Sequence, residues 1–217
     1  METRMRHDIP QNAILLTKME ALSNQLELIK TWNPRSEVWS LLFGRAILTS
    51  AASLTGFYIN QRFRRKLKFR NFGVFPTMAG VTTGPAVATT LLYTEIILNK
   101  MLLLEISCPI CLESRSILLQ ASTGLLLPLI LVPFANFSIG ARSGMHNIPH
   151  ITDVKGIFRI ISSVYKPMIP VIATIFTFHA LLAGFITHSQ IKSFLHILDV
   201  QNFIEQDRRD QKFSKAF

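Results

Sequence analysis

The chain has 217 residues, of which 49% are hydrophobic and 17% are charged. A soluble domain carries about 25% charged residues, and the long apolar blocks here argue against a soluble globular protein. The formal net charge of +10 does not indicate nucleic-acid binding, because the basic residues form no stripe with interleaved aromatics and no nucleic-acid-binding motif is present. They instead flank the apolar blocks, where they orient a membrane protein and meet lipid head groups.

The first segment, residues 1–37, contains a predicted amphipathic helix over residues 11–31 and a linker. Asn33-Pro34 ends this helix, because the residue before a proline avoids helical backbone angles. The helix can pair with a partner helix, lie along the membrane surface or pack on the chain's own bundle. Its apolar side chains recur every three or four residues and so share one face: Leu15, Met19, Leu22, Leu26 and Ile29.

Four apolar blocks follow, and each is long enough to cross a bilayer core of about 30 Å as a helix. Prolines within the second and third blocks are tolerated, because neighbouring helices satisfy the backbone groups that proline frees. The sequence therefore predicts an all-α integral membrane bundle of about four transmembrane helices over residues 38–188. The expected spans are residues 38–58, 74–93, 117–139 and 168–187.

Two further segments are amphipathic and too polar to cross a membrane. Residues 154–166 gather Ile157, Phe158 and Ile161 opposite lysine and arginine, which is typical of an interfacial helix. Residues 191–203 show a similar apolar face. The C-terminal region, residues 189–217, is therefore expected to be an amphipathic helix followed by a polar tail.

The basic residues predict the orientation of the bundle. The loop between the first and second spans carries six of them and no acid, and the loop between the third and fourth spans adds four against one acid. Loops rich in lysine and arginine stay on the side from which insertion starts. Both termini and the middle loop are therefore expected on the opposite side. The membrane-orienting basic loop comprises Arg62, Arg64, Arg65, Lys66, Lys68 and Arg70.

Cys108 and Cys111 form the most distinctive motif, C-P-I-C, in the middle loop. Two cysteines at this spacing can close a small disulfide ring, act as an attacking and a resolving thiol, or stay unpaired. A zinc site would need two more ligands. His146 and His150 are expected on the opposite side of the membrane, so no metal site is predicted.

Small residues four apart give three spans a face on which another helix can approach closely. This face either packs within the four helices or binds another membrane protein. The candidate partner-binding residues are Gly80 and Gly84 in the second span, Ala52 and Gly56 in the first, and Ala180 and Gly184 in the fourth.

Two ionisable residues fall within the spans. His179 can be a neutral histidine bonded to a neighbouring helix or part of a functional path, and Arg45 lies where it can extend to the interface. A small membrane carrier that uses both is a minor alternative. No hydrolase, nucleotide-binding or metalloprotease motif is present, so we expect neither an enzyme nor a cofactor.

The order of several motifs resembles the transmembrane protein 126 family. The first span runs into Phe63-Arg64-Arg65, and a glycine- and threonine-rich second span follows. The pattern C-x-x-C-x-x-x-R-S, here Cys108 to Ser116, is similar to the family's A member, whereas the B member lacks the full cysteine pair. The resemblance runs from about residue 40 to 190 and includes Ala141-Arg142, Lys155-Gly156 and Lys166-Pro167. The basic loop is denser here, and the loop around His146 is rearranged.

This resemblance implies a protein of the mitochondrial inner membrane. Family members act as assembly factors, or chaperones, for respiratory complex I, and bind newly made subunits of its membrane arm. The implied partners are those subunits, other complex I assembly factors and the inner-membrane insertion machinery. With the matrix as the basic side, both termini and the Cys108/Cys111 pair would face the intermembrane space, where a thiol relay is the alternative function.

Overall fold

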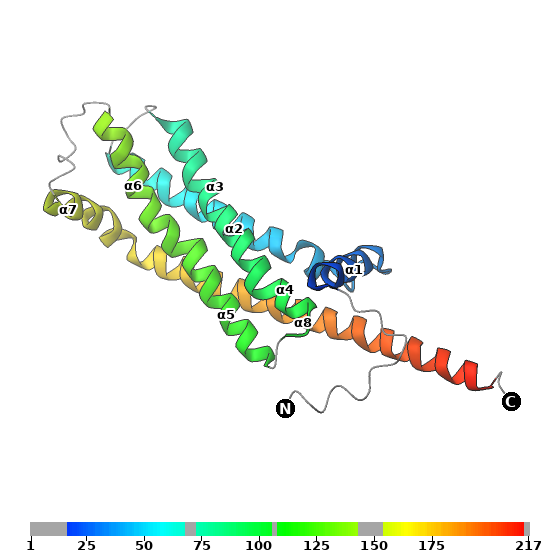
Figure 1. Ribbon diagram of the computed structural model, residues 1–217. Helices are drawn as coiled ribbons and strands as arrows, with labels where there is room; N and C mark the ends of the chain where they lie inside the picture. The colour runs from blue at the N-terminus through cyan, green and yellow to red at the C-terminus, as the bar shows by residue number, and fades with distance from the viewer. Residues whose placement is uncertain (1–16, 68–72, 106–107, 143–153, 215–217) are drawn as a thin grey trace, which may run out of the picture.

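The computed structural model describes residues 17–67, 73–105, 108–142 and 154–214, and every regular element within them is helical. Four helical stretches are long and apolar enough to cross a membrane, which confirms the predicted all-α membrane bundle (Figure 1). These stretches are Trp39–Leu67, Val74–Leu102, Pro109–Gly140 and Lys155–Arg208.

Several of these stretches consist of more than one element. The first is α2, Trp39–Leu67. The second joins α3, Val74–Tyr93, to the π-helical turn η1, Thr94–Leu98, and to α4, Asn99–Leu102. The third joins α5, Pro109–Ala121, through the π-helical turn η2, Ser122–Leu126, to α6, Leu127–Arg142. The fourth begins in α7, Val154–Tyr165, passes a 3-10 turn, η3, Lys166–Met168, and continues as α8, Ile169–Ser214.

The N-terminal helix α1, Lys18–Thr31, packs on the chain's own bundle. Thr17 and Glu20 form a capping box: the Thr17 amide donates to the Glu20 carboxylate at 2.8 Å, and the Glu20 amide donates to the Thr17 hydroxyl at 3.4 Å. Ile29 is buried among residues of the other helices. The helix ends at Thr31, just before Asn33-Pro34, as predicted, whereas residues 11–16 lie outside the described residues.

Helix α8 is longer than the predicted fourth span and includes the segment expected to form a separate C-terminal helix. No proline or glycine follows Gly184, so nothing in the sequence interrupts the helix after the membrane span. Its 46 residues extend about 69 Å, more than twice a bilayer core of about 30 Å. The first turns of its C-terminal half still pack against α1, and its last turns project beyond the other helices (Figure 1).

The bundle has two distinct ends. The C-terminal turns of α2, the N-terminus of α3, α7 and the start of α8 lie at one end, which we call the basic end (Figure 1). Helices α1 and α4 and the N-terminus of α5 lie at the other, the cysteine end. The termini of the described chain, α1 and the C-terminal half of α8, are on the side of the cysteine end.

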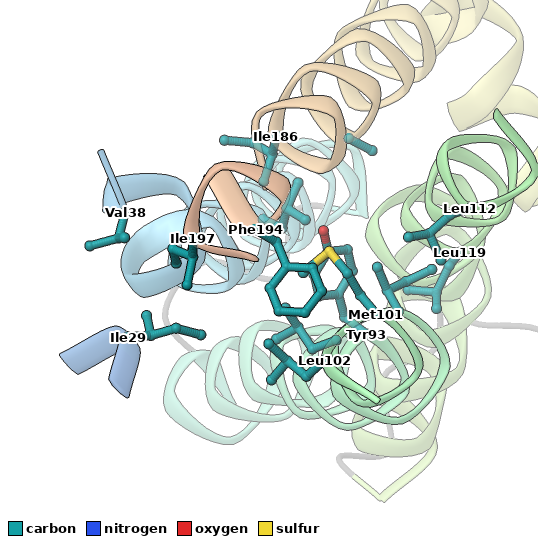
Figure 2. Packing of buried hydrophobic residues seen from close by; sticks show 14 residues of the cluster. Ile29, Val38, Tyr93, Met101, Leu102, Leu112, Leu119, Ile186, Phe194 and Ile197 are labelled. Atoms are coloured by element: carbon teal, nitrogen blue, oxygen red, sulfur yellow. The ribbon is translucent and has the colours of Figure 1, made fainter. Parts of the chain in front are cut away.

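Two groups of buried apolar side chains fill the bundle. The group near the cysteine end brings Ile29 of α1 and Val38 together with Tyr93 of α3 and with Phe194 and Ile197 of α8 (Figure 2). The group near the basic end joins α2, α3, η2, α6 and α7, and it includes Ile59, Phe63, Val81, Val132 and Val164.

Three prolines within the spans leave backbone carbonyls without their helical partner, because proline has no N–H to donate to the residue four positions earlier. Pro85 frees the carbonyl of Val81, which packs against Gly56 of α2. Pro133 frees the carbonyl of Leu129, which accepts a hydrogen bond from the Tyr165 hydroxyl. Pro128 lies in the first turn of α6, directly after η2, where the Leu127 amide donates to the Ser122 carbonyl. A neighbouring helix thus supplies a donor for the carbonyl that Pro133 frees, as expected for a membrane protein.

Candidate functional site

Polar side chains inside the bundle gather at three levels, and the first lies near the cysteine end. The Tyr93 hydroxyl donates to Gln190 Oε1 at 2.7 Å and lies 3.0 Å from the Thr187 hydroxyl. Thr187 donates to Ser116 at 2.6 Å, and Gln190 Nε2 donates to the Ser40 carbonyl at 3.0 Å. All five residues are buried. This level therefore ties α2, α3, α5 and α8 together.

The central level contains His179, which has no exposed surface. Gln120 Nε2 donates to the Leu48 carbonyl at 3.0 Å and to His179 Nδ1 at 3.1 Å. His179 therefore carries its proton on Nε2, which lies 2.9 Å from the Thr55 hydroxyl and donates to it. His179 is thus a neutral imidazole that bridges α2, α5 and α8. This is the structural role that the sequence left open for it.

The π-helical turn η2 makes room for this histidine. A Cβ on Gly124 would lie 2.8 Å from His179 Cε1 and 3.0 Å from its Nδ1, so only glycine fits there. Thr123, in the same turn, accepts a hydrogen bond of 2.9 Å from Thr89 of α3. The turn thus brings both a small residue and a polar one to the centre of the bundle.

The third level lies near the basic end and contains Arg64, which the sequence assigned to the membrane-orienting loop. Its side chain turns inward, and its Nη1 donates to the Thr77 hydroxyl at 2.9 Å, the Gly73 carbonyl at 3.3 Å and Asn136 Oδ1 at 3.5 Å. Asn136 in turn donates to Asn60 Oδ1 at 2.7 Å. Arg64 is therefore an interior residue that joins α2, α3 and α6, and it does not face lipid head groups.

Three other residues of the predicted basic loop lie in a helix rather than in a loop. Arg62, Arg65 and Lys66 are exposed, but they lie in the last turns of α2, because the helix continues nine residues past Tyr58. No proline or glycine occurs there to stop it. Lys68 and Arg70 lie outside the described residues.

The cysteine pair caps helix α5. The Cys108 sulfur accepts a hydrogen bond of 3.3 Å from the Cys111 amide, and Pro109 occupies the first helical position. The pKa of the Cys108 thiol lies below its ordinary value, chiefly because the Cys111 thiol and then the Cys111 amide stabilise the Cys108 thiolate. The two cysteines form no disulfide in this structure, and Cys111 is exposed. Cys108 is thus the better nucleophile of the two.

The small residues differ in what their faces contact. Ala52 is fully buried, and a Cβ on Gly56 would lie 2.5 Å from the Val81 carbonyl oxygen, so this face packs inside the bundle. Gly84 faces Leu131 of α6, and Gly184 faces Ile117 of α5. Ala180, one turn before Gly184, is partly buried. Ala52 and Gly56 are thus buried, and Gly84, Ala180 and Gly184 are partly buried.

Gly80 differs from the other small residues. It is exposed, and a Cβ on it would meet nothing within 4 Å. The same face of α3 carries Thr83, Val87 and Leu91, all exposed. We call this outward-facing surface the Gly80 face.

Arg45 and His179 do not form a common site. Arg45 is exposed and donates to the Thr94 hydroxyl of η1 at 3.1 Å. His179 lies in the interior and contacts Thr55 and Gln120. No contact between described residues links the two, so the geometry gives a carrier that uses both residues no support.

The comparisons with known proteins agree with the motif order. Residues 19–202 match the family described as transmembrane protein 126. A protein of that name from Drosophila melanogaster is 31% identical over 211 residues, covering 94% of this chain and 95% of its own length. The chain belongs to the transmembrane protein 126 family. No solved structure gives a significant match.

The match to the transmembrane protein 126 family covers the first three membrane-spanning stretches and the fourth as far as residue 202, so the polar levels and the Gly80 face lie within it. Sequence reasoning missed most of the interior polar residues. One signal was available on α2, where Asn60 and Arg64 continue the spacing of four set by Ala52 and Gly56. In the part of the chain that the structure describes, no group of three or more histidine, cysteine or acidic residues is placed to hold a metal.

Proposed function

We propose that this chain is a non-enzymatic assembly factor of the mitochondrial inner membrane that binds membrane-arm subunits of respiratory complex I during their biogenesis. The role is the one that the resemblance to the transmembrane protein 126 family implies. The Gly80 face is the observation that supports it, because it is a surface of this bundle on which another transmembrane helix can approach closely. The other small residues are used to assemble the bundle itself.

The shape of the Gly80 face suits a helix of an unassembled subunit. Gly80 and Thr83 form a shallow part of the face, and Val87 and Leu91 project beyond it toward the C-terminal end of α3. Helix association in lipid relies on van der Waals packing, because lipid tails are as apolar as the side chains. A shallow surface beside projecting side chains gives a partner helix more contact than lipid does.

The polar interior of the bundle also supports a binding role rather than transport. At each of the three levels the buried polar groups bond chiefly to one another, so they hold the four spans in fixed positions rather than forming an open polar path. The proposed orientation places the basic end in the matrix. Both termini and the cysteine end then face the intermembrane space, where α8 would project toward other assembly factors.

Affinity purification from mitochondria in a mild detergent, with mass spectrometry, tests the binding. The wild-type chain is expected to recover complex I membrane-arm subunits in particles smaller than the full complex. Gly80→Leu fills the shallow part of the face and should lose them. Ala173→Leu makes the same kind of change at an exposed position of α8 and should retain them.

Two results would contradict the proposal. If the intact wild-type chain recovers no membrane-arm subunit, the complex I role is wrong. If Gly80→Leu and Ala173→Leu recover equal amounts, partners bind through some other surface.

A thiol relay in the intermembrane space is the second candidate, and the geometry of the cysteine pair favours it. The Cys108 thiolate would attack one sulfur of a partner disulfide and release the other sulfur as a thiolate. The Cys111 thiolate would then attack Cys108 Sγ of the mixed disulfide and release the second thiolate. The partner is thereby reduced, and Cys108 and Cys111 become a disulfide. Replacing both by serine should abolish function, and full function of that variant would exclude the relay.

A further inference from the structure

A lipid-facing groove runs between α2 and α8. Near the cysteine end the two helices touch directly, with Gly44 against Ile186 and Gln190. Toward the basic end they leave a groove of about 660 Å³, a size at which protein pockets hold small molecules. Its walls are almost entirely apolar, and they include Phe43, Leu54, Tyr58, Val171, Ile175 and Phe178.

The polar atoms along most of the groove already have partners within the protein. The Ser50 hydroxyl donates to the Ala46 carbonyl at 2.8 Å, and the Thr55 hydroxyl is bonded to His179 at 2.9 Å. The walls therefore present hydrocarbon to whatever fills the groove. An occupant with polar groups along its length would leave those groups unsatisfied, which costs free energy in a membrane.

The groove ends in cationic and hydrogen-bonding groups. Tyr58 lines the groove, and its hydroxyl accepts a hydrogen bond of 3.3 Å from Arg62 Nε. The Arg62 guanidinium carbon lies 5.7 Å from the centre of the Tyr58 ring, a cation–π distance. The Tyr58 hydroxyl keeps its own proton to donate, and no described residue accepts from the terminal nitrogens of Arg62. An anionic oxygen at this position would find several donors.

The surroundings of Arg62 add positive charge. Exposed cations from α2, α7 and η3 gather at the basic end, and within the described residues none of them pairs with an acid. Helix α7 presents exposed Phe158 next to Arg159, as an interfacial helix does. The exposed cations are Arg62, Arg65, Lys66, Lys155, Arg159 and Lys166.

We propose that this groove is a binding site for an anionic phospholipid, with an acyl chain along the groove and the phosphate at Arg62 and Tyr58. The positive charge selects an anionic head group by charge complementarity. Basic pockets between transmembrane helices bind anionic lipid head groups in the same way. The groove is also long enough to hold an acyl chain. From Phe43 to Tyr58, α2 advances about 22 Å, which exceeds the thickness of one leaflet of the hydrocarbon core, about 15 Å. The site lies away from the Gly80 face and does not rest on the assembly role.

The test uses the full-length protein, purified in detergent and stripped of lipid. Phosphatidylglycerol and phosphatidylcholine with identical acyl chains are titrated in turn, and bound lipid is counted by native mass spectrometry. The wild-type protein should bind phosphatidylglycerol more tightly. Arg62→Gln should reduce that preference about fivefold, the contribution of one cation near a lipid surface. Arg35→Gln, a matched change of an exposed arginine at the cysteine end, should leave it unchanged.

Two further variants separate the head group from the acyl chain. Arg62→Lys retains the charge and should retain most of the preference. Ala51→Phe fills the groove and should weaken binding of both lipids. Binding of phosphatidylcholine by Arg62→Gln at the wild-type level shows that the variant is folded. Equal binding of the two lipids by the wild-type protein would overturn the proposal, and so would equal effects of Arg62→Gln and Arg35→Gln.

Discussion

The hydroxyl group of Tyr165, the last residue of α7, donates a hydrogen bond of 2.8 Å to the carbonyl oxygen of Leu129 in α6. Leu129 lacks its usual helical partner because Pro133, four residues later, has no N–H. A side chain at the membrane interface thus compensates for a proline inside the third span, and the same bond fixes α7 against the bundle.

We expect Tyr165→Phe to lower the free energy of unfolding by about 0.6 kcal/mol, the measured average for hydrogen bonds inside a membrane protein, and by no more than about 1.7 kcal/mol, the largest measured value. In the Pro133→Ala background the Leu129 carbonyl regains a helical N–H, so the same change should cost less. Unfolding of the four proteins of this double-mutant cycle in mixed detergent measures the difference. An equal cost in both backgrounds would show that the hydroxyl does not serve the carbonyl that the proline frees.

Gly124 should tolerate no side chain. Gly124→Ala places a Cβ 2.8 Å from His179 Cε1, and we expect this overpacking to cost about 1–3 kcal/mol. Gly80→Ala is the matched control, since nothing lies within 4 Å of a Cβ there. It should leave thermal unfolding in detergent unchanged or raise its midpoint slightly, because alanine favours the helix. If both variants unfold at the same temperature, the close contact between Gly124 and His179 is contradicted.

Arg64 and Arg65 are neighbours in the sequence but should differ sharply on substitution. Arg64→Leu removes the donor to the Thr77 hydroxyl and to Asn136 Oδ1, which should cost about 1–3 kcal/mol for the unsatisfied buried groups. The Gly73 carbonyl still accepts from Thr77. Arg65 is exposed, so Arg65→Leu should change stability by less than about 0.5 kcal/mol. Thermal unfolding of both variants in the same detergent measures the contrast, and a larger effect of Arg65→Leu would contradict the inward position of Arg64.

Cys108 should react with iodoacetamide at lower pH than an ordinary thiol. The thiolate is the reactive form, and the pKa of Cys108 is lowered chiefly by the Cys111 side chain. Removing that side chain in Cys111→Ala should raise the pKa of Cys108 and shift its alkylation profile to higher pH. Mass spectrometry of the labelled peptide at a series of pH values measures the shift. An unchanged profile in Cys111→Ala would show that Cys111 does not activate Cys108.

The number of spans and their approximate positions could be predicted from the sequence, because blocks of apolar residues are required to cross a bilayer whatever the tertiary packing. The residues at which the helices end could not be predicted in this way. The sequence placed the end of the first span near Tyr58, where the charges begin, but α2 continues to Leu67 and carries Arg64 to a buried partner. Hydropathy marks where lipid ends, whereas the helix ends only where the backbone is interrupted.

The candidate site shows a second limit of prediction. The Ala52/Gly56 and Gly80/Gly84 pairs have the same spacing, yet Gly56 packs on Val81 whereas Gly80 faces outward. Spacing shows that small residues share a helix face, but the direction of that face depends on how each helix is rotated in the bundle. The partners of Gln120 depend on the same rotations, so the sequence showed only that a polar residue lies within a span.

The central claim is that this chain assists assembly of the membrane arm of complex I. The most direct test is pulse-labelling of newly made membrane-arm subunits in cells that lack the protein, with their subassemblies resolved on native gels. Wild-type protein should restore progress of these subunits into the full complex, and Gly80→Leu at equal abundance should not. If membrane-arm subassemblies mature at the normal rate in cells without the protein, the assembly role is contradicted.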